Sequence, residues 1–518
     1  MSEVVHPNLE SIEPERVTDA APAIYASQWK KAATSPVLRF LLLLLLLTAG
    51  AFREAQLVSA FSGDDVWRFL RVGSWILQNH SLPHTGIYSQ FAASPWVDLN
   101  WPYELLLTLS WRLAGLRAFP LMLMAMKAVL AAAIFYLADG IRHYWRALLL
   151  SAAVQVVLLD LLPLPMFFSI LCFTLALRAL LEVRRSHNLR SILWLPFLFW
   201  LWIMMDAYFL LGWVLLAVFM LAEGWERLFD ATGVAPNNAV RVPFAHLSGV
   251  VTASVGVVLL TPYSFRCIAP AFDSCYSLTL FKNFGFMAAM NFRQAAHFVV
   301  LLMVLSACFV MGQRNRRDAF HVLLLLSFSS LGFRIQNNVW ALAVTAVAIL
   351  SCAHSEQAKR EAPAYIITKQ MRLYGALSAA TAALIAVAAL LLPSNQEIDR
   401  RLALVVPEKA CNFIEKTRPA GPIFDDYNWS GYVMWKLPEY PVAIDSRLPL
   451  YGGDAQEHYF QVVMGKQKME TLETFTSARV YLLPSQWGMT RALTEIPELK
   501  QQFREVYRDD LAVVLVRQ

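Results

Sequence analysis

Long apolar runs separated by short polar stretches dominate the chain between residues 36 and 393. A membrane-spanning helix needs about 20 apolar residues, within a range of about 17–25. This pattern predicts about eleven spans. The count is approximate because the pairs 191–205/207–223 and 319–333/338–353 contain short members that tilt little or only partly cross. The others lie at residues 36–53, 118–138, 147–162, 166–183, 243–261, 294–312 and 373–393.

The two ends of the chain look like ordinary polar protein. Residues 1–35 form a polar tail, and residues 394–518 alternate short apolar stretches with helical periodicity. In the C-terminal part we expect strands near 422–424, 442–444, 479–483 and 511–516, and helices near 408–416, 455–463 and 491–502. The sequence thus predicts a polytopic α-helical membrane protein, with a transmembrane domain at 36–393 and a soluble α/β domain at 394–518.

Composition supports this division. The chain is 57% hydrophobic and 16% charged, whereas soluble domains carry about 25% charged residues. The basic residues fall in small clusters between apolar runs rather than on one face, so no nucleic-acid partner is expected. The first apolar run follows a polar tail and lacks a small-residue cleavage site, which is typical of a signal anchor.

Lysine and arginine in short loops set the orientation of a membrane protein, because cytoplasmic loops carry an excess of them. Arg16, Lys30, Lys31 and Arg39 precede or begin the first span, which puts the N-terminus in the cytoplasm. With eleven spans, each later cytoplasmic loop is also basic: Arg142 and Arg146; Arg184, Arg185 and Arg190; Arg227 and Arg241; Arg314, Arg316 and Arg317; Lys359, Arg360, Lys369 and Arg372. The C-terminal domain is then expected in the periplasm, outside a bacterial inner membrane.

The outer side of the predicted bundle gathers polar residues. The first outer loop, residues 54–117, contains Asp64, Asp65, Asp98 and Glu104, and later outer ends carry Asp160, Asp206 and the run 334–338 (RIQNN). Ionisable groups at membrane depth are costly and are functional candidates by default. Asp160 and Asp206 are equally compatible with solvated positions at the level of the lipid headgroups.

Two stretches of the first outer loop have the spacing of amphipathic helices. Residues 67–79 place apolar side chains on one side and Arg68 and Arg71 on the other. Residues 98–114 repeat the pattern, with Trp101, Tyr103 and Trp111 as aromatic anchors. We expect both to lie in the membrane interface.

The remaining polar and sulfur-containing residues give weaker signals. The six cysteines show no spacing typical of a metal site. Cys267 and Cys275 share one loop and would be able to pair in an oxidising compartment. Asp445 and Arg447 are expected to pair with each other or to cap a loop, in preference to binding substrate.

Several of these stretches together resemble one known family. Residues 63–76 (GDDVWRFLRVGSWI), 82–89 (LPHTGIYS) and 95–98 (PWVD) are similar to the first outer loop of GT-C glycosyltransferases, in particular bacterial members with an α/β tail. The resemblance continues through 165–181 and 202–212. It is strongest in the tail, at 424–432 (FDDYNWSGY), 444–452 (IDSRLPLYG) and 509–514 (DDLAVV).

The resemblance implies a transfer reaction at the outer face. GT-C enzymes typically move a sugar from a polyprenyl-phosphate carrier to an acceptor, and acidic residues of the first outer loop serve as the catalytic base. That role would fall on Asp65, or on Asp64 beside it, since such a transfer needs a carboxylate to take the acceptor's proton. Cations must hold the departing phosphate, and the candidates for the substrate site are Arg334, Arg68, Arg71, Arg266, Asp206 and Asn337.

The chain also departs from the family pattern, which usually has His at Phe69, an Asp near Gly86, an acid at Asn100, Arg and Gln at Leu164 and Met166, and a His near Asp206. Two functions therefore stay open: an active transferase, or a catalytically degenerate scaffold or partner subunit of an envelope complex. A transporter ranks below both, because the sequence shows no two matching sets of broken helices. Expected partners are a lipid-linked sugar donor, membrane lipids and a protein in the membrane or periplasm. No definite cofactor is expected, with a divalent cation as the one candidate.

Overall fold

The structure, a computed structural model, describes residues 64–140, 142–159, 164–231, 242–276, 285–313, 318–352 and 392–518, together with isolated positions between 35 and 46 and at 282 and 390. The chain divides into two compact units, Met1–Leu45 and Leu46–Gln518, and the description below concerns the second. The predicted first and last spans, 36–53 and 373–393, lie largely outside the described residues, as do Asp160 and the basic clusters at 314–317 and 359–372.

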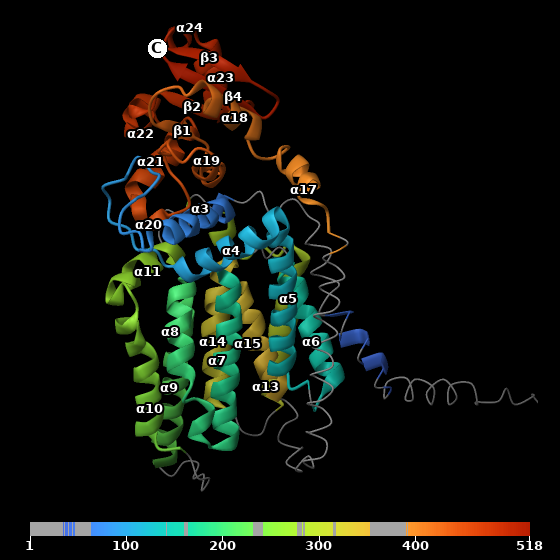
Figure 1. Cartoon of the computed structure of the whole chain (residues 1–518). Coiled ribbons are helices and arrows are strands. Elements are labelled where there is room, and N and C mark those ends of the chain that lie inside the picture. Colours follow the sequence, from blue (N-terminus) through green and yellow to red (C-terminus); the bar gives the residue numbers. More distant parts are fainter. Residues whose placement is uncertain are drawn as a thin grey trace, which may run out of the picture. The chain divides into compact units, whose positions relative to one another are not determined.

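Each predicted span inside the described ranges coincides with a helix. These helices lie alongside one another (Figure 1), and α15 is the central one, because nearly all of its side chains are buried against α5, α6, α7, α13 and α14. Their bounds are α5 Ala118–Leu137, α6 Tyr144–Val157, α7 Met166–Ser186, α8 Leu195–Met205, α9 Phe209–Ala231, α10 Phe244–Gly256, α13 Ala295–Gly312, α14 Ala319–Arg334 and α15 Val339–Cys352.

Length limits how many of these helices can cross a membrane. Among the described residues, four helices are long and apolar enough, within Trp101–Leu137, Met166–Ser186, Phe209–Phe229 and Ala295–Gly312. A fifth span exists if Phe244–Leu260 and Ser264–Tyr276, which meet at a 91° bend, form one broken span. A 14-residue helix such as α15 is only about 21 Å long, short of a hydrocarbon core of about 30 Å. The predicted count of eleven is therefore not confirmed.

The predicted first outer loop, residues 54–117, contains two helices, α3 (Asp64–Asn79) and α4 (Trp101–Ala114). They approach closely at Gly73, where a Cβ atom would overlap the carbonyl oxygen of Glu104 and the hydroxyl of Thr108. Helix α4 exposes an apolar stripe at Leu106, Leu109 and Leu113, as an interfacial helix would. Helix α3 differs from the expected interfacial helix, because its length from Val66 to Ile76 is mostly buried between α4 and the tail helix α19 (Ser430–Lys436).

The C-terminal tail is built on a four-stranded sheet of order β1-β2-β4-β3. Strand β1 (Ile423–Asp425) pairs in parallel with β2 (Val480–Pro484), and β4 (Ala512–Arg517) pairs antiparallel with both β2 and β3 (Phe503–Arg508). The strands β1, β2 and β4 were predicted within one or two residues from their buried apolar runs. The other tail helices are α17 Asn395–Leu402, α18 Glu408–Thr417, α20 Leu448–Tyr451, α21 Gly453–Val463, α22 Glu473–Ser477, α23 Gly488–Glu495 and α24 Pro497–Lys500.

Two tail elements differ from the sequence prediction. The expected helix at 491–502 is split, because Pro497 has no amide hydrogen to continue a helix, and β3 follows it. Strand β3 was not predicted because it is an exposed edge strand of mostly polar residues. The apolar segment 442–444 does not join the sheet: Val442 exchanges backbone hydrogen bonds of 3.0 Å with Tyr88 and Gln90 of the first outer loop.

The tail and the first outer loop share one hydrophobic core. Val72 and Ile76 of α3, with Trp96 from the loop, belong to the same buried cluster as Phe424 and Tyr481 of the sheet. The loop is therefore held from two sides, by the helical bundle below α4 and by the tail above α3. These contacts of the loop with the bundle and the tail position the candidate site.

Candidate functional site

Arg68 is the centre of the polar network between the first outer loop and the tail. Its guanidinium group is buried, with the residue 5% exposed, and it contacts three groups from three parts of the chain. Nε donates to Oγ of Ser446 at 2.8 Å, Nη2 to Oδ1 of Asp65 at 3.2 Å, and Nη1 to Oε1 of Glu104 at 3.5 Å. These contacts make Arg68 a link between the loop and the tail, and its predicted role as a phosphate ligand behind Arg334 stays a prediction.

Asp65 is the candidate base that reaches the surface. It lies in the first turn of α3, where a carboxylate is stabilised by the helix dipole. Its side chain is 41% exposed, and one oxygen is oriented by Arg68. Asp64 begins the same helix, but its side chain falls outside the described part of the structure. Asp65 therefore has the accessibility that a general base requires.

Two further carboxyl groups lie beneath Arg68. Asp98 and Glu104 are 2% and 0% exposed, and they interact directly with each other. Burial raises the pKa of Asp98 above its ordinary value. Asn100 connects this pair to the bundle, because its backbone N–H donates to Oδ1 of Asp98 and its side-chain amide donates to the carbonyl of Met205, both at 3.0 Å.

Asp445 and Arg447 of the tail pair with each other, as expected. Nε and Nη2 of Arg447 donate to the two carboxylate oxygens of Asp445 at 3.0 and 2.6 Å, and the Tyr451 hydroxyl donates to the same carboxylate. Burial acts to raise the pKa of Asp445, but the charge of Arg447 holds it below the ordinary value. Arg447 also donates to the carbonyl of Ile87 at 2.8 Å, so the pair fastens the tail to the first outer loop.

One short tail segment connects the Asp65 region with the Arg334 region. Ser446 binds Arg68, and Leu448, two residues later, packs against Ile335 and Met287. Two residues span at most about 7 Å of extended chain. Arg334 immediately precedes Ile335, at the end of α14, so Asp65 and Arg334 belong to elements that converge on the same segment of the tail.

The candidate cations differ in exposure. Arg334 and Arg266 are exposed, and Arg266 lies in the 3-10 turn Ser264–Cys267 at the 91° bend. Arg71 is half-buried, with its guanidinium carbon 4.6 Å from the centre of the Tyr88 ring, a cation–π contact. Arg334 and Arg266 are thus the cations most available to an anionic ligand from outside.

Asp206 and Asn337 are turned into the bundle. The Asp206 carboxylate accepts from the Ser169 hydroxyl, which itself accepts from Nε1 of Trp202 at 2.7 Å. Asn337 donates to the Tyr208 hydroxyl, two residues from Asp206. These contacts explain how a buried Asp206, 7% exposed, is satisfied without solvent. Its carboxylate is therefore not solvated at headgroup level, and a role in substrate binding stays a prediction.

A divalent cation does not fit the described residues well. No three His, Cys, Asp or Glu side chains among them come together as a metal site, and Arg68 places a positive charge beside the Asp98–Glu104 pair. All six cysteines are free, and Cys267 and Cys275 are both buried, so the suggested disulfide is absent. We derive no reaction step through a metal.

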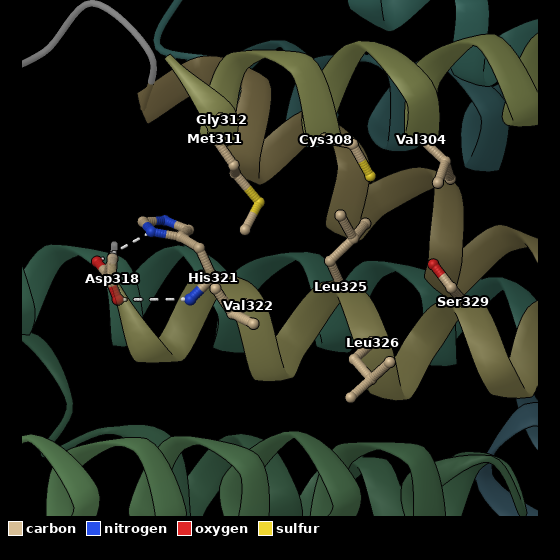
Figure 2. A pocket seen from close by; sticks show the side chains of 10 residues that line it. All are labelled: Val304, Cys308, Met311, Gly312, Asp318, His321, Val322, Leu325, Leu326 and Ser329. Atoms are coloured by element: carbon tan, nitrogen blue, oxygen red, sulfur yellow. Dashed lines mark hydrogen bonds and ion pairs between the residues drawn. The ribbon is translucent and has the colours of Figure 1, made fainter. Parts of the chain in front are cut away.

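A separate polar cluster lies toward the other end of α7. Arg184 is 15 residues beyond Ser169, or about 22 Å along the helix axis. It forms ion pairs with Glu223, with Glu226 at 2.8 Å and with Asp318 at 3.1 Å. Asp318 caps α14 and pairs with Nδ1 of His321 at 2.9 Å, beside a cavity of about 390 Å³ between α13 and α14 (Figure 2). That cavity contains no predicted site residue.

Sequence reasoning missed Ser446 and the contact between Asp98 and Glu104. Ser446 lies inside the resembling segment 444–452, which was the available signal, but a serine alone carries no sign of a distant arginine partner. Asp98 and Glu104 were noted as outer-loop acids, yet a separation of six residues predicts no contact within one helix. Both depend on the tertiary arrangement.

Comparisons with known proteins give a fold-level likeness. No family model matches the chain, and no curated protein matches it. The archaeal oligosaccharyltransferase AglB from Archaeoglobus fulgidus, in complex with an inhibitory peptide and a dolichol-phosphate, is similar with a TM-score of 0.47 and 9% identity, over 93% of this chain and 73% of that one. The Archaeoglobus fulgidus oligosaccharyltransferase tethered to an acceptor peptide has a TM-score of 0.48 and 10% identity, over 96% and 75%.

At these TM-scores and identities the likeness supplies neither a site residue nor a substrate for this chain.

Proposed function

We propose that this chain is a membrane glycosyltransferase that moves a sugar from a polyprenyl-phosphate carrier to an acceptor at the outer face of a bacterial inner membrane. The observation that carries the proposal is Asp65, a partly exposed carboxylate oriented by a buried arginine. It stands in the loop segment whose sequence resembles GT-C enzymes.

The reaction requires a base and an anion site. Asp65 would take the proton of the acceptor hydroxyl as that oxygen forms a bond to the anomeric carbon of the sugar. The bond from this carbon to the phosphate oxygen breaks, and its electron pair leaves with the polyprenyl phosphate. Arg334 and Arg266, both exposed, are the cations that would stabilise the departing phosphate.

A lipid-borne donor fits the surroundings of this site. Helix α4 runs directly into α5 as one apolar stretch, Trp101–Leu137, and it exposes Leu106, Leu109 and Leu113 beside the first outer loop. Exposed leucines at this spacing suit contact with acyl or isoprenoid chains. The donor's sugar phosphate would then lie at the ends of the helices, where Arg334 closes α14.

A second candidate function is a scaffold that no longer transfers sugar. The ring of Phe69, at a position where the family pattern has histidine, packs edge-on against Tyr103 with ring centres 5.3 Å apart. Beside it, each guanidinium nitrogen of Arg68 donates to a group of the protein itself, one in the tail and two in the loop. A site of this composition would bind a lipid or protein without turning it over.

The decisive experiment compares purified wild type with Asp65→Asn, using a polyprenyl-phosphate-linked sugar and an extract of envelope acceptors. The transferase proposal expects release of polyprenyl phosphate to fall by about 10²–10⁴-fold, as is typical for loss of a general base. Asp454→Asn, at an exposed carboxylate of α21, is the matched control and should keep the wild-type rate. Wild type that releases no more polyprenyl phosphate than a reaction without protein would favour the scaffold, and measurable release that is equal in wild type and Asp65→Asn would exclude Asp65 as the base.

A further inference from the structure

Asp98 and Glu104 present an unbalanced charge in the interior of the protein. Both side chains are buried, at 2% and 0% exposure, and they contact each other. Oδ2 of Asp98 and Oε2 of Glu104 accept no hydrogen bond from any group that the structure describes. Two buried carboxylate oxygens without donors, on side chains in contact, require either a proton or a cation between them.

A count of the neighbouring charges favours the proton. Arg447 is neutralised by the bidentate contact with Asp445, and Asp65 is 41% exposed and partly solvated. Arg68 is then left facing both Asp98 and Glu104. Two like charges in contact inside a protein repel each other more strongly than in water, because the effective dielectric constant there is lower. One shared proton brings this buried group of three side chains to zero net charge.

We propose that Asp98 and Glu104 share one proton, and that this singly charged carboxyl pair is the counterion that fixes Arg68 beneath the tail. Asp98 and Glu104 are then positioning residues, which act on Asp65 through Arg68. The role of Asp98 and Glu104 in positioning Asp65 rests on the proposed function. Because the test below measures stability and protonation instead of sugar transfer, either proposal can fail while the other stands.

The charged groups that face the pair are Arg68 and Arg447, and the phenols of Tyr103 and Tyr263 lie beside it. Asp65 and Asp445 act on Arg68. Burial raises the pKa of Asp98. A carboxyl group whose pKa is raised in the folded state contributes most stability at low pH, and the contribution falls as pH rises through that folded pKa.

The test uses amide variants of the full chain in detergent. In Asp98→Asn or Glu104→Gln, the new amide replaces the protonated carboxyl group, donates to the remaining carboxylate and leaves the charge balance unchanged. Each single variant should therefore keep the wild-type unfolding midpoint at pH 7. The double variant removes the negative charge, so its midpoint should fall by several degrees.

Infrared difference spectra give the second readout. Wild type minus either single variant should show the carbonyl band of a protonated carboxyl group at pH 7, because the remaining acid is ionised in both variants. Absence of that band, or single variants as unstable as the double, would overturn the proposal. A divalent-metal chelator that lowers the unfolding midpoint of wild type but not that of the single variants would also overturn the proposal. It would show that a bound cation, and not a proton, lies between the two carboxyl groups.

Discussion

Ser446 accepts a hydrogen bond of 2.8 Å from Nε of Arg68, a residue 378 positions earlier in the chain. The bond joins the tail to the helix that carries Asp65. Nη2 of Arg68 can hold Asp65 in place only while the guanidinium group is itself fixed, which the bond from Nε to Ser446 does. The tail is therefore part of the candidate site, although none of its residues was predicted to bind substrate.

Replacing Ser446 tests this link. Ser446→Ala leaves Nε of a buried arginine without its acceptor, and hydrogen bonds to charged groups contribute about 1.5–3 kcal/mol. We expect the unfolding free energy to fall by about that amount, measured by denaturant titration of the purified protein. Ser110→Ala, at a hydroxyl that bonds only to a carbonyl of its own helix, is the control and should change stability little. A stability loss no larger than that of the control would show that the bond to Arg68 contributes nothing.

Gly73→Ala tests the close approach of α3 and α4. The added methyl group overlaps the carbonyl oxygen of Glu104, which is backbone and cannot turn aside. Forcing an extra group into a close contact costs about 1–3 kcal/mol, so we expect a lower unfolding midpoint. Gly488→Ala, where nothing lies within 4 Å of the new Cβ, should have the wild-type midpoint. A Gly73→Ala protein as stable as wild type would mean that the two helices are separated more widely.

The stability of the tail should depend on pH through Asp426. Burial raises the pKa of Asp426 to about 6, compared with about 3.9 in an unfolded chain. The folded state therefore holds this proton more tightly, and the unfolding free energy should fall as pH rises from about 4 to about 6, by on the order of 3 kcal/mol at most.

Asp426→Asn keeps the oxygen that accepts from Asn428 and removes the titration. It should flatten the stability profile between pH 4 and pH 6 and raise stability at pH 7. Circular dichroism melts over this pH range measure both effects. Asp454→Asn, at an exposed carboxylate, should leave the slope unchanged; a slope that persists in Asp426→Asn would assign it to another group.

Cysteine labelling tests the orientation. Lys500 in the tail and Gln313 after α13 are both exposed, so cysteines at these positions are accessible on their own sides. In a Cys308→Ser background, Lys500→Cys should react with an impermeant maleimide in cells with a permeabilised outer membrane, and Gln313→Cys only after lysis. Labelling of Gln313→Cys in intact spheroplasts would reverse the predicted topology.

The local spacing of apolar residues predicted most helices and strands, but not the segments that pack against them. The apolar spacing of α3 predicted a helix, yet not its burial, because α19 covers it from residues more than 350 positions away. In the same way, the apolar triplet at 442–444 read as a strand, and only the fold reveals that its partner is the first outer loop. Periodicity reports which face avoids water, not which segment covers it.

The same difference applies to the candidate site, where the sequence predicted residues but not their partners. Asp65 was predicted from its place in the loop, and its partial exposure agrees with that role. Arg68 was expected to meet a phosphate, but charge alone cannot distinguish an arginine that binds a ligand from one that binds Ser446 and Glu104. Asp206 gave the same ambiguity: the Ser169 contact shows that its carboxylate is buried and hydrogen-bonded, and its role in substrate binding stays a prediction.

The backbone pairing of Val442 with Tyr88 and Gln90 has a consequence for synthesis of the chain. The ribosome makes Tyr88 long before Val442, and at about 5–20 residues per second the 354 residues from Ser89 to Val442 take roughly 20–70 s. During that time the loop has hydrogen-bonding groups and apolar side chains without their final partner. Its maturation must therefore wait until Val442 has been made, and a ribosome stalled before residue 442 should leave the loop sensitive to protease.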